Sequence, residues 1–133
     1  MRYELSYDQE RDLILGKVEG DLNRVLVEEM SYKFAKLASS SRCFKLLNDL
    51  RSANITPSTF DIYAMPRIVE KQGVPFVSRR AILVSELSEE FEFLETVSVN
   101  VGQMVRIFND EQAALEWLNA GETLPDKPDS GGT

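Results

Sequence analysis

Asp49 and Arg51 are the residues of this chain that come closest to a reactive or ligand-binding pair. They stand two positions apart at the end of a short apolar run, where a carboxylate and a guanidinium can pair or hold a charged ligand. Hydroxyl and amide side chains lie close by in the sequence. The candidate partner or regulatory face consists of Asn48, Asp49, Arg51, Ser52, Thr56, Ser58 and Thr59. Simpler roles stay open, because Asp49 can bond a turn and Thr56 can cap a helix.

The composition argues against catalysis. The chain has no histidine, which removes the commonest general base near neutral pH, the commonest zinc ligand and every Ser–His or Cys–His pair. Cys43 precedes the third predicted strand, at the opposite end from the candidate face, and only Arg42 and Lys45 stand near it to activate its thiol. The acidic residues of 86–95 are spread round a helix, which is typical of a solvated face. We predict a protein that is not an enzyme and has no cofactor or metal.

Charge and apolar content indicate where the protein works. A net charge of −7 opposes binding to nucleic acid or to anionic lipid surfaces, and Arg79–Arg80 is the only basic pair. The single cysteine fits a reducing compartment. The chain opens with alternating charged residues rather than an apolar signal core, and no run approaches the roughly 18 apolar residues of a membrane span. These features predict a cytoplasmic protein with no nucleic-acid partner and no integral membrane segment.

The candidate side chains must be positioned by alternating strands and helices. Apolar periodicity predicts strands at 3–7, 13–18, 44–50, 81–84 and 104–108. The run 81–84 is continuously apolar, which is typical of a strand covered on both faces. Helices are predicted to begin at the N-caps Asp21, Thr56, Ser88 and Asn109, the last with Gln112 in a capping box. Pro66 should kink or split the second helix, and Gly16 is a candidate β-bulge.

The order β-β-α-β-α-β-α-β-α determines the fold class. Helices between successive strands force parallel pairing, and the opening hairpin adds one antiparallel edge strand. The sequence predicts a single α/β domain over residues 1–121, with a mostly parallel five-stranded sheet, and a flexible tail over 122–133. Ligand and regulatory sites of such sheets gather at the carboxyl ends of the strands. The candidate face follows the third of them.

Three segments carry a resemblance to a known group. They are LLNDLR (46–51), RRAILVSE (79–86) and VRIFNDEQAALEWL (105–118). Together with the element order, they resemble the SpoIIAA-like branch of the STAS superfamily over roughly residues 1–120. The resemblance implies a SpoIIAA-like fold and a non-enzymatic regulatory or sensing module.

STAS modules include anti-sigma-factor antagonists, which are switched by phosphorylation where the third strand meets the next helix. Those antagonists carry Asp-Ser-Ser-Gly at the switch, whereas this chain has Asp49-Leu50-Arg51-Ser52. Asp49 matches the aspartate, but no serine follows it directly. The resemblance therefore assigns no phosphorylated residue to this chain.

Two functional hypotheses follow, from different classes. The first is a cytoplasmic regulatory module that binds a protein partner through the candidate face. The second is a carrier of a lipid or another apolar small molecule, because CRAL-TRIO lipid-binding domains share the fold class. Its ligand would lie beneath the helix that Pro66 breaks, among Phe60, Tyr63, Met65 and Phe76. Self-association into a homodimer through an exposed edge strand is left open.

Overall fold

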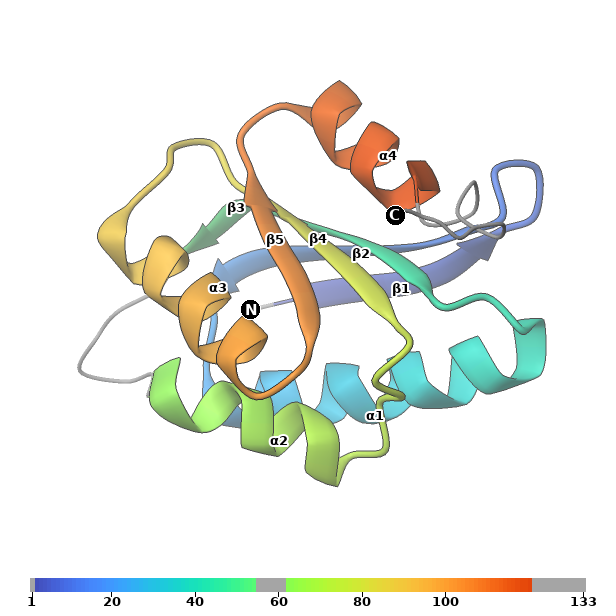
Figure 1. Cartoon of the computed structure of the whole chain (residues 1–133), viewed down its shortest axis with the longest axis horizontal. Helices are drawn as coiled ribbons and strands as arrows, with labels where there is room; N and C mark the ends of the chain where they lie inside the picture. The colour runs from blue at the N-terminus through green and yellow to red at the C-terminus, as the bar shows by residue number, and fades with distance from the viewer. Residues whose placement is uncertain (1, 55–61, 121–133) are drawn as a thin grey trace, which may run out of the picture.

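The computed structural model describes residues 2–54 and 62–120. These residues form one sheet in the order β1-β2-β3-β4-β5 (Figure 1). The strands are β1 Arg2–Asp8, β2 Leu13–Asp21, β3 Lys45–Asn54, β4 Arg79–Leu83 and β5 Met104–Phe108. β1 and β2 pair antiparallel, and all other neighbours are parallel. The predicted sheet, mostly parallel with one antiparallel edge strand, is confirmed.

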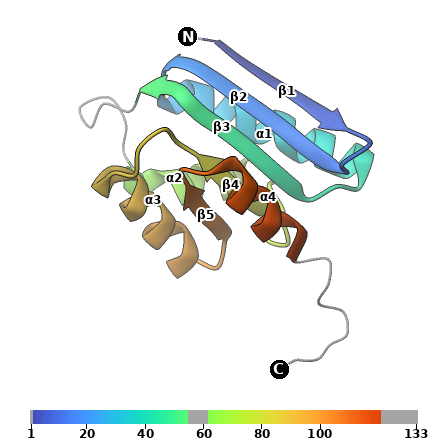
Figure 2. The same cartoon turned by 90° about the horizontal axis from the view of Figure 1, so that it is seen from above.

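The helices cover the two faces of the sheet unequally. They are α1 Arg24–Ser41, α2 Met65–Lys71, α3 Glu89–Asn100 and α4 Glu111–Ala120, with the short 3-10 turn η1 Ile62–Ala64 before α2. The first three helices lie on one face, and α4 lies on the other, across β3, β4 and β5 (Figures 1 and 2). The β1–β2 hairpin is therefore not covered by α4. Within the described ranges, none of the helices combines the length and hydrophobicity that crossing a membrane requires.

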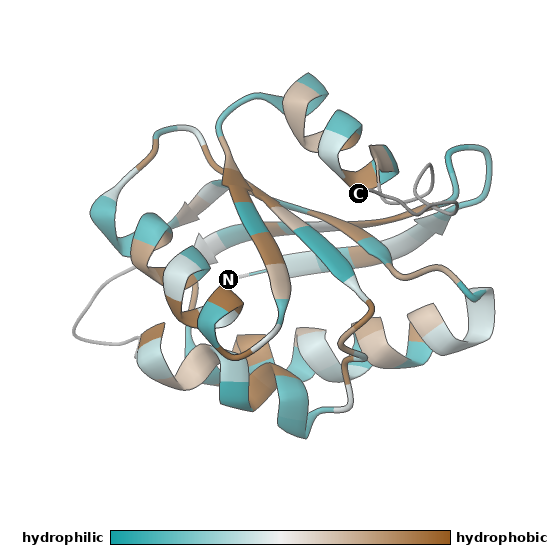
Figure 3. Ribbon diagram, in the orientation of Figure 1, coloured by the Kyte–Doolittle hydropathy of each residue, from teal (hydrophilic) through white to brown (hydrophobic). Residues whose placement is uncertain are grey.

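Side chains alternate between the two faces of the sheet along each strand, which divides the hydrophobic core between these faces. On β3, Leu46 and Leu50 pack toward the three-helix face, whereas Leu47 packs toward Leu118 of α4. The continuous run Ala81–Val84 is buried on both sides, as its composition predicts. Figure 3 shows hydrophobic residues along parts of the strands, and hydrophilic and hydrophobic residues in alternation along the helices. The sheet therefore separates the apolar core beneath α1, α2 and α3 from the apolar core beneath α4.

β3 is longer than the sequence predicts. The prediction ends this strand at Leu50, but it continues to Asn54 because β2 runs beside it, with Gly20 paired to Ala53. Backbone hydrogen bonds to a neighbouring strand override the polar character of the last four residues. As a result, Arg51 lies within the strand and not in a connecting loop.

Two helices begin later than their predicted caps. Asp21 is the last residue of β2, and Asn23 caps α1 by accepting a hydrogen bond from the backbone N–H of Leu26 (2.9 Å). At α4, Asp110 accepts from the N–H of Ala113 (3.3 Å), so the cap is Asp110 and not Asn109. Asn and Asp cap helices about equally well, so residue type alone does not decide which of two nearby Asn or Asp residues is the cap.

Pro66 stands where the short 3-10 turn η1 gives way to α2, and not in the middle of a longer helix. It lies in the first turn of α2, directly after η1, where its missing N–H is not needed. The predicted start at Thr56 lies outside the described residues, as does the predicted tail. Ser88 caps α3 as predicted, accepting from the N–H of Phe91 (3.3 Å).

Gly16 is not a β-bulge. It pairs in regular register with Leu5 on one side and Asn48 on the other, and the irregularity of β2 lies between Lys17 and Glu19. A Cβ atom at position 16 would lie 3.0 Å from Leu5 Cδ1. Glycine therefore allows the close approach of the Leu5 side chain to β2.

Candidate functional site

A groove of about 320 Å³ lies between α4 and the open β1–β2 hairpin, and we call it the α4 groove. Leu15, Leu47 and Leu83 give it an apolar lining. Its polar lining is formed by Glu4, Ser6, Arg11, Lys17, Asp49, Arg51 and Glu111. The groove thus combines an apolar base from three strands with charged groups of both signs.

Asp49 and Arg51 form a bidentate ion pair in this groove. Arg51 Nε donates to Asp49 Oδ1 (3.0 Å) and Arg51 Nη2 donates to Asp49 Oδ2 (2.9 Å). Partial burial acts to raise the pKa of Asp49, but the hydrogen bonds and charge of Arg51 outweigh it, so that this pKa lies below its ordinary value. Asp49 therefore stays ionised at neutral pH and is a poor general base.

Glu111 extends the ion pair to α4. Its Oε1 atom lies 3.4 Å from Arg51 Nη2, and its position in the first turn of α4 favours a negative charge. Lys17 stands directly beside Asp49 in the β2–β3 pairing. The groove therefore gathers two acidic and two basic groups from β2, β3 and α4.

The sequence predicted only part of this group. Asp49 and Arg51 are brought together as proposed, because residues two apart in a strand share a face. Glu111 and Lys17 were missed. Glu111 follows directly after the capping residue Asp110, and its place at the carboxyl end of β5 was the signal that could have found it.

The other candidate residues lie elsewhere. Asn48 points to the three-helix face, where its Oδ1 atom is buried and has no hydrogen-bond partner among residues 2–54 and 62–120. Ser52 is exposed on β3 and pairs in register with Glu19. Thr56, Ser58 and Thr59 lie outside the described residues. The structure therefore joins Asp49 with Arg51 and places Asn48 on the opposite face of the sheet.

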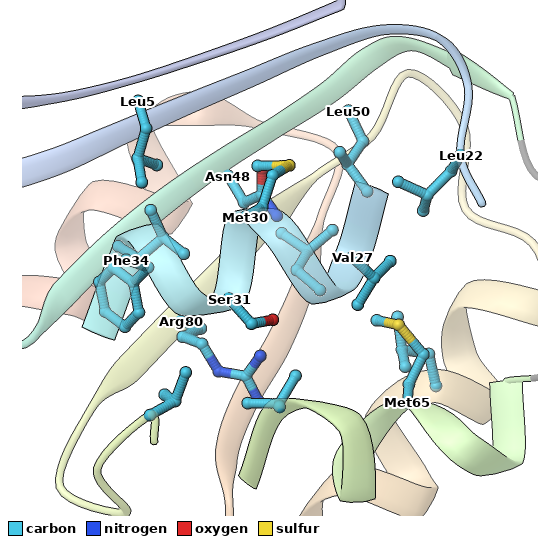
Figure 4. Close-up of a pocket in the computed structure, with 15 residues that line it drawn as sticks. Leu5, Leu22, Val27, Met30, Ser31, Phe34, Asn48, Leu50, Met65 and Arg80 are labelled. Atoms are coloured by element: carbon cyan, nitrogen blue, oxygen red, sulfur yellow. The ribbon is translucent and has the colours of Figure 1, made fainter. Parts of the chain in front are cut away.

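Asn48 lines a cavity of about 50 Å³ between the sheet and helices α1 and α2 (Figure 4). Its other walls are mainly apolar and include Phe34 and Met65. A cavity of this size holds about three or four waters, and a lipid acyl chain does not fit. Tyr63, which the carrier hypothesis placed at the ligand, is 73% exposed and packs edge-on against Phe93 outside the cavity. The cavity gives no support to a lipid carrier.

Arg80 is a second polar residue in the cavity wall. Its Nη2 atom donates to Gln103 Oε1 (2.6 Å), and Gln103 Nε2 donates to the carbonyl of Pro66 (2.8 Å). Burial lowers the pKa of Arg80, and no carboxylate in the described segments forms an ion pair with it. Arg80 and Gln103 together tie β4 to the first turn of α2.

The described residues offer no obvious centre for covalent or metal chemistry. Cys43 precedes β3, as predicted. Its side chain is buried, and burial raises the pKa of its thiol. No group of three His, Cys, Asp or Glu side chains in residues 2–54 and 62–120 is arranged to hold a metal ion.

Comparison with known proteins identifies the fold. No protein-family model matches the chain, and no curated protein sequence matches it. The structure is similar to that of the anti-sigma factor antagonist SpoIIAA in its unphosphorylated form, with a TM-score of 0.56 and 12% identity over 89% of this chain and 98% of that chain.

Two further solved structures agree. The phosphorylated form of SpoIIAA, a Bacillus cell fate determinant, gives a TM-score of 0.53 and 12% identity over 84% of this chain and 96% of that chain. An uncharacterised DUF3478 protein from Shewanella loihica, described as having a SpoIIAA-like fold, gives a TM-score of 0.56 and 21% identity over 87% of this chain and 93% of that chain. This chain therefore has a SpoIIAA-like fold.

Proposed function

We propose that this protein is a non-enzymatic regulatory module that binds a protein partner through the α4 groove and the adjoining carboxyl end of β3. The observation that carries the proposal is the groove itself, in which an apolar base is bordered by the ion pairs of Arg51. Apolar centres with polar rims are typical of protein interfaces. The likeness to SpoIIAA, an anti-sigma factor antagonist, supports a role in protein binding.

The chemistry of the groove supports binding over catalysis. Both oxygens of Asp49 accept hydrogen bonds from Arg51, and the chain has no histidine to act in its place. Charges that are held in fixed positions favour a partner of complementary charge. They are less suited to transferring protons. The proposed site is therefore a recognition surface.

The proposed face also includes the hydroxyl residues that follow Asp49 in the sequence. Ser52 is exposed at the carboxyl half of β3, and Thr56, Ser58 and Thr59 come next along the chain. Phosphorylation of any of them would add negative charge to the segment that follows Asp49. We propose that the module acts in the cytoplasm, where a single cysteine stays reduced.

Photocrosslinking in cells tests the proposal. A photoreactive amino acid at Lys17, inside the α4 groove, is expected to capture one defined protein, identified by mass spectrometry. The matched control is the same substitution at Lys71, an exposed lysine of α2 on the other face. Capture of the same protein from Lys71 alone, or capture of none from Lys17, would contradict the proposal.

A further inference from the structure

The two edge strands of the sheet are protected differently. β5 has five residues, and the N–H of Ile107 donates to Glu95 Oε1 of α3 (2.8 Å). β1 has seven residues, contains no proline and pairs with β2 in unbroken register. In the part of the chain that the structure describes, no strand lies on its outer side (Figure 2). A regular edge strand of this kind offers unpaired N–H and C=O groups to another strand.

The sequence of β1 is complementary to itself when two copies run antiparallel. A pairing centred on Leu5 sets Arg2 of each copy opposite Asp8 of the other, and Tyr3 opposite Tyr7. Arg2 and Asp8 share a face because side chains alternate with a period of two. Opposite charges and aromatic rings that face each other across strands stabilise the pairing.

The charges also disfavour the neighbouring registers. A shift that centres the pairing on Glu4 sets the two copies of Glu4 against each other, and a shift to Ser6 sets Glu4 against Asp8. Like charges directly opposite each other destabilise a strand pair. The register centred on Leu5 is therefore the favoured one.

We propose that a second copy of this chain pairs antiparallel with β1 about a two-fold axis through Leu5, joining the two sheets into one. The axis is perpendicular to the sheet, so that both α4 helices lie on the same side. Glu4 and Ser6 line the α4 groove, and Ser6 of the second copy lies opposite Glu4. Each groove then borders the other, and the dimer presents a two-fold recognition surface. The pairing itself does not depend on which partner that surface binds.

Arg2 and Asp8 of β1 already have partners within one copy. Arg2 binds Glu19, and Asp8 binds Arg11, both at exposed positions. A guanidinium has five N–H donors and a carboxylate about four acceptor sites, so each group can bond a second partner. The existing ion pairs hold Arg2 and Asp8 on the outer strand and leave hydrogen-bonding groups of both side chains available for a second partner.

Native mass spectrometry and sedimentation equilibrium of the full chain test the proposal. The natural protein is expected to form a dimer, and Arg2→Asp and Asp8→Arg are each expected to weaken it roughly tenfold or more, because each sets like charges opposite one another twice. An equimolar mixture of the two variants is expected to form a heterodimer with restored affinity, since every facing pair is again of opposite charge.

Two controls keep this test decisive. Arg106→Asp reverses an exposed charge on the opposite edge strand β5 and is expected to leave the dimer unchanged. Far-ultraviolet circular dichroism checks that each variant is folded. A natural protein that stays monomeric at high micromolar concentration would overturn the proposal without any variant. Folded variants that dimerise as the natural chain does, or that fail to form the heterodimer, would also overturn it.

Discussion

Replacing Leu118 with alanine is expected to lower the free energy of unfolding by about 3 kcal/mol. Leu118 is a residue of α4 that is fully buried against the sheet, among Leu47, Leu83 and Ala114. In the described part of the chain, α4 is the only helix on its face of the sheet, so no neighbouring helix can close the cavity that the substitution leaves. Denaturant unfolding monitored by circular dichroism measures the loss.

The matched control for this substitution is Leu87→Ala. Leu87 is 50% exposed before α3, and its replacement should change stability by less than about 0.5 kcal/mol. The carboxyl end of α4 keeps other attachments, since Arg79 Nη2 donates to the carbonyl of Trp117 (2.8 Å) and Lys45 Nζ to Asn119 Oδ1 (3.2 Å). The Leu118 variant should therefore remain folded. Equal effects of the two substitutions would show that α4 is not packed as described.

Replacing Arg51 with glutamate is expected to weaken binding of the photocrosslinked partner roughly tenfold or more. The change removes the cation that Asp49 and Glu111 share and leaves three carboxylates in its place. It also removes the hydrogen bonds that hold the pKa of Asp49 below its ordinary value. Isothermal titration calorimetry with the purified partner measures the loss.

Arg67→Glu is the matched charge reversal for Arg51→Glu. Arg67 is an exposed arginine of α2, on the three-helix face. The Arg67→Glu substitution should change the affinity for the partner by less than about twofold, because a single exposed charge far from an interface contributes little. A greater loss of affinity in the Arg67 variant than in the Arg51 variant would place the partner on α2 and contradict the account.

The fold could be predicted because strand and helix signals along this chain agree with their surroundings. The apolar run Ala81–Val84 required two covered faces, and the helices between later strands required parallel neighbours. Boundaries were less certain, since they depend on neighbours. β3 reaches Asn54 only because β2 continues beside it, which no property of residues 51–54 indicates.

The candidate site could be predicted only where its contacts are local. Asp49 and Arg51 are two positions apart, so the strand period places them on one face. The same period turns Asn48 to the opposite face, which the prediction overlooked. Arg51 and Glu111 are 60 positions apart and meet because α4 crosses β3. Such a contact follows from tertiary packing, which a single sequence does not specify.

Nuclear magnetic resonance tests most directly the claim that the α4 groove is the recognition surface. Isotope-labelled protein is titrated with the unlabelled photocrosslinked partner while its backbone amide signals are followed. The account predicts that the signals of Lys17, Asp49 and Glu111 shift or broaden, and that those of Thr96 and Asn100 on α3 do not. Changes confined to α2 and α3, with the groove signals unmoved, would contradict it.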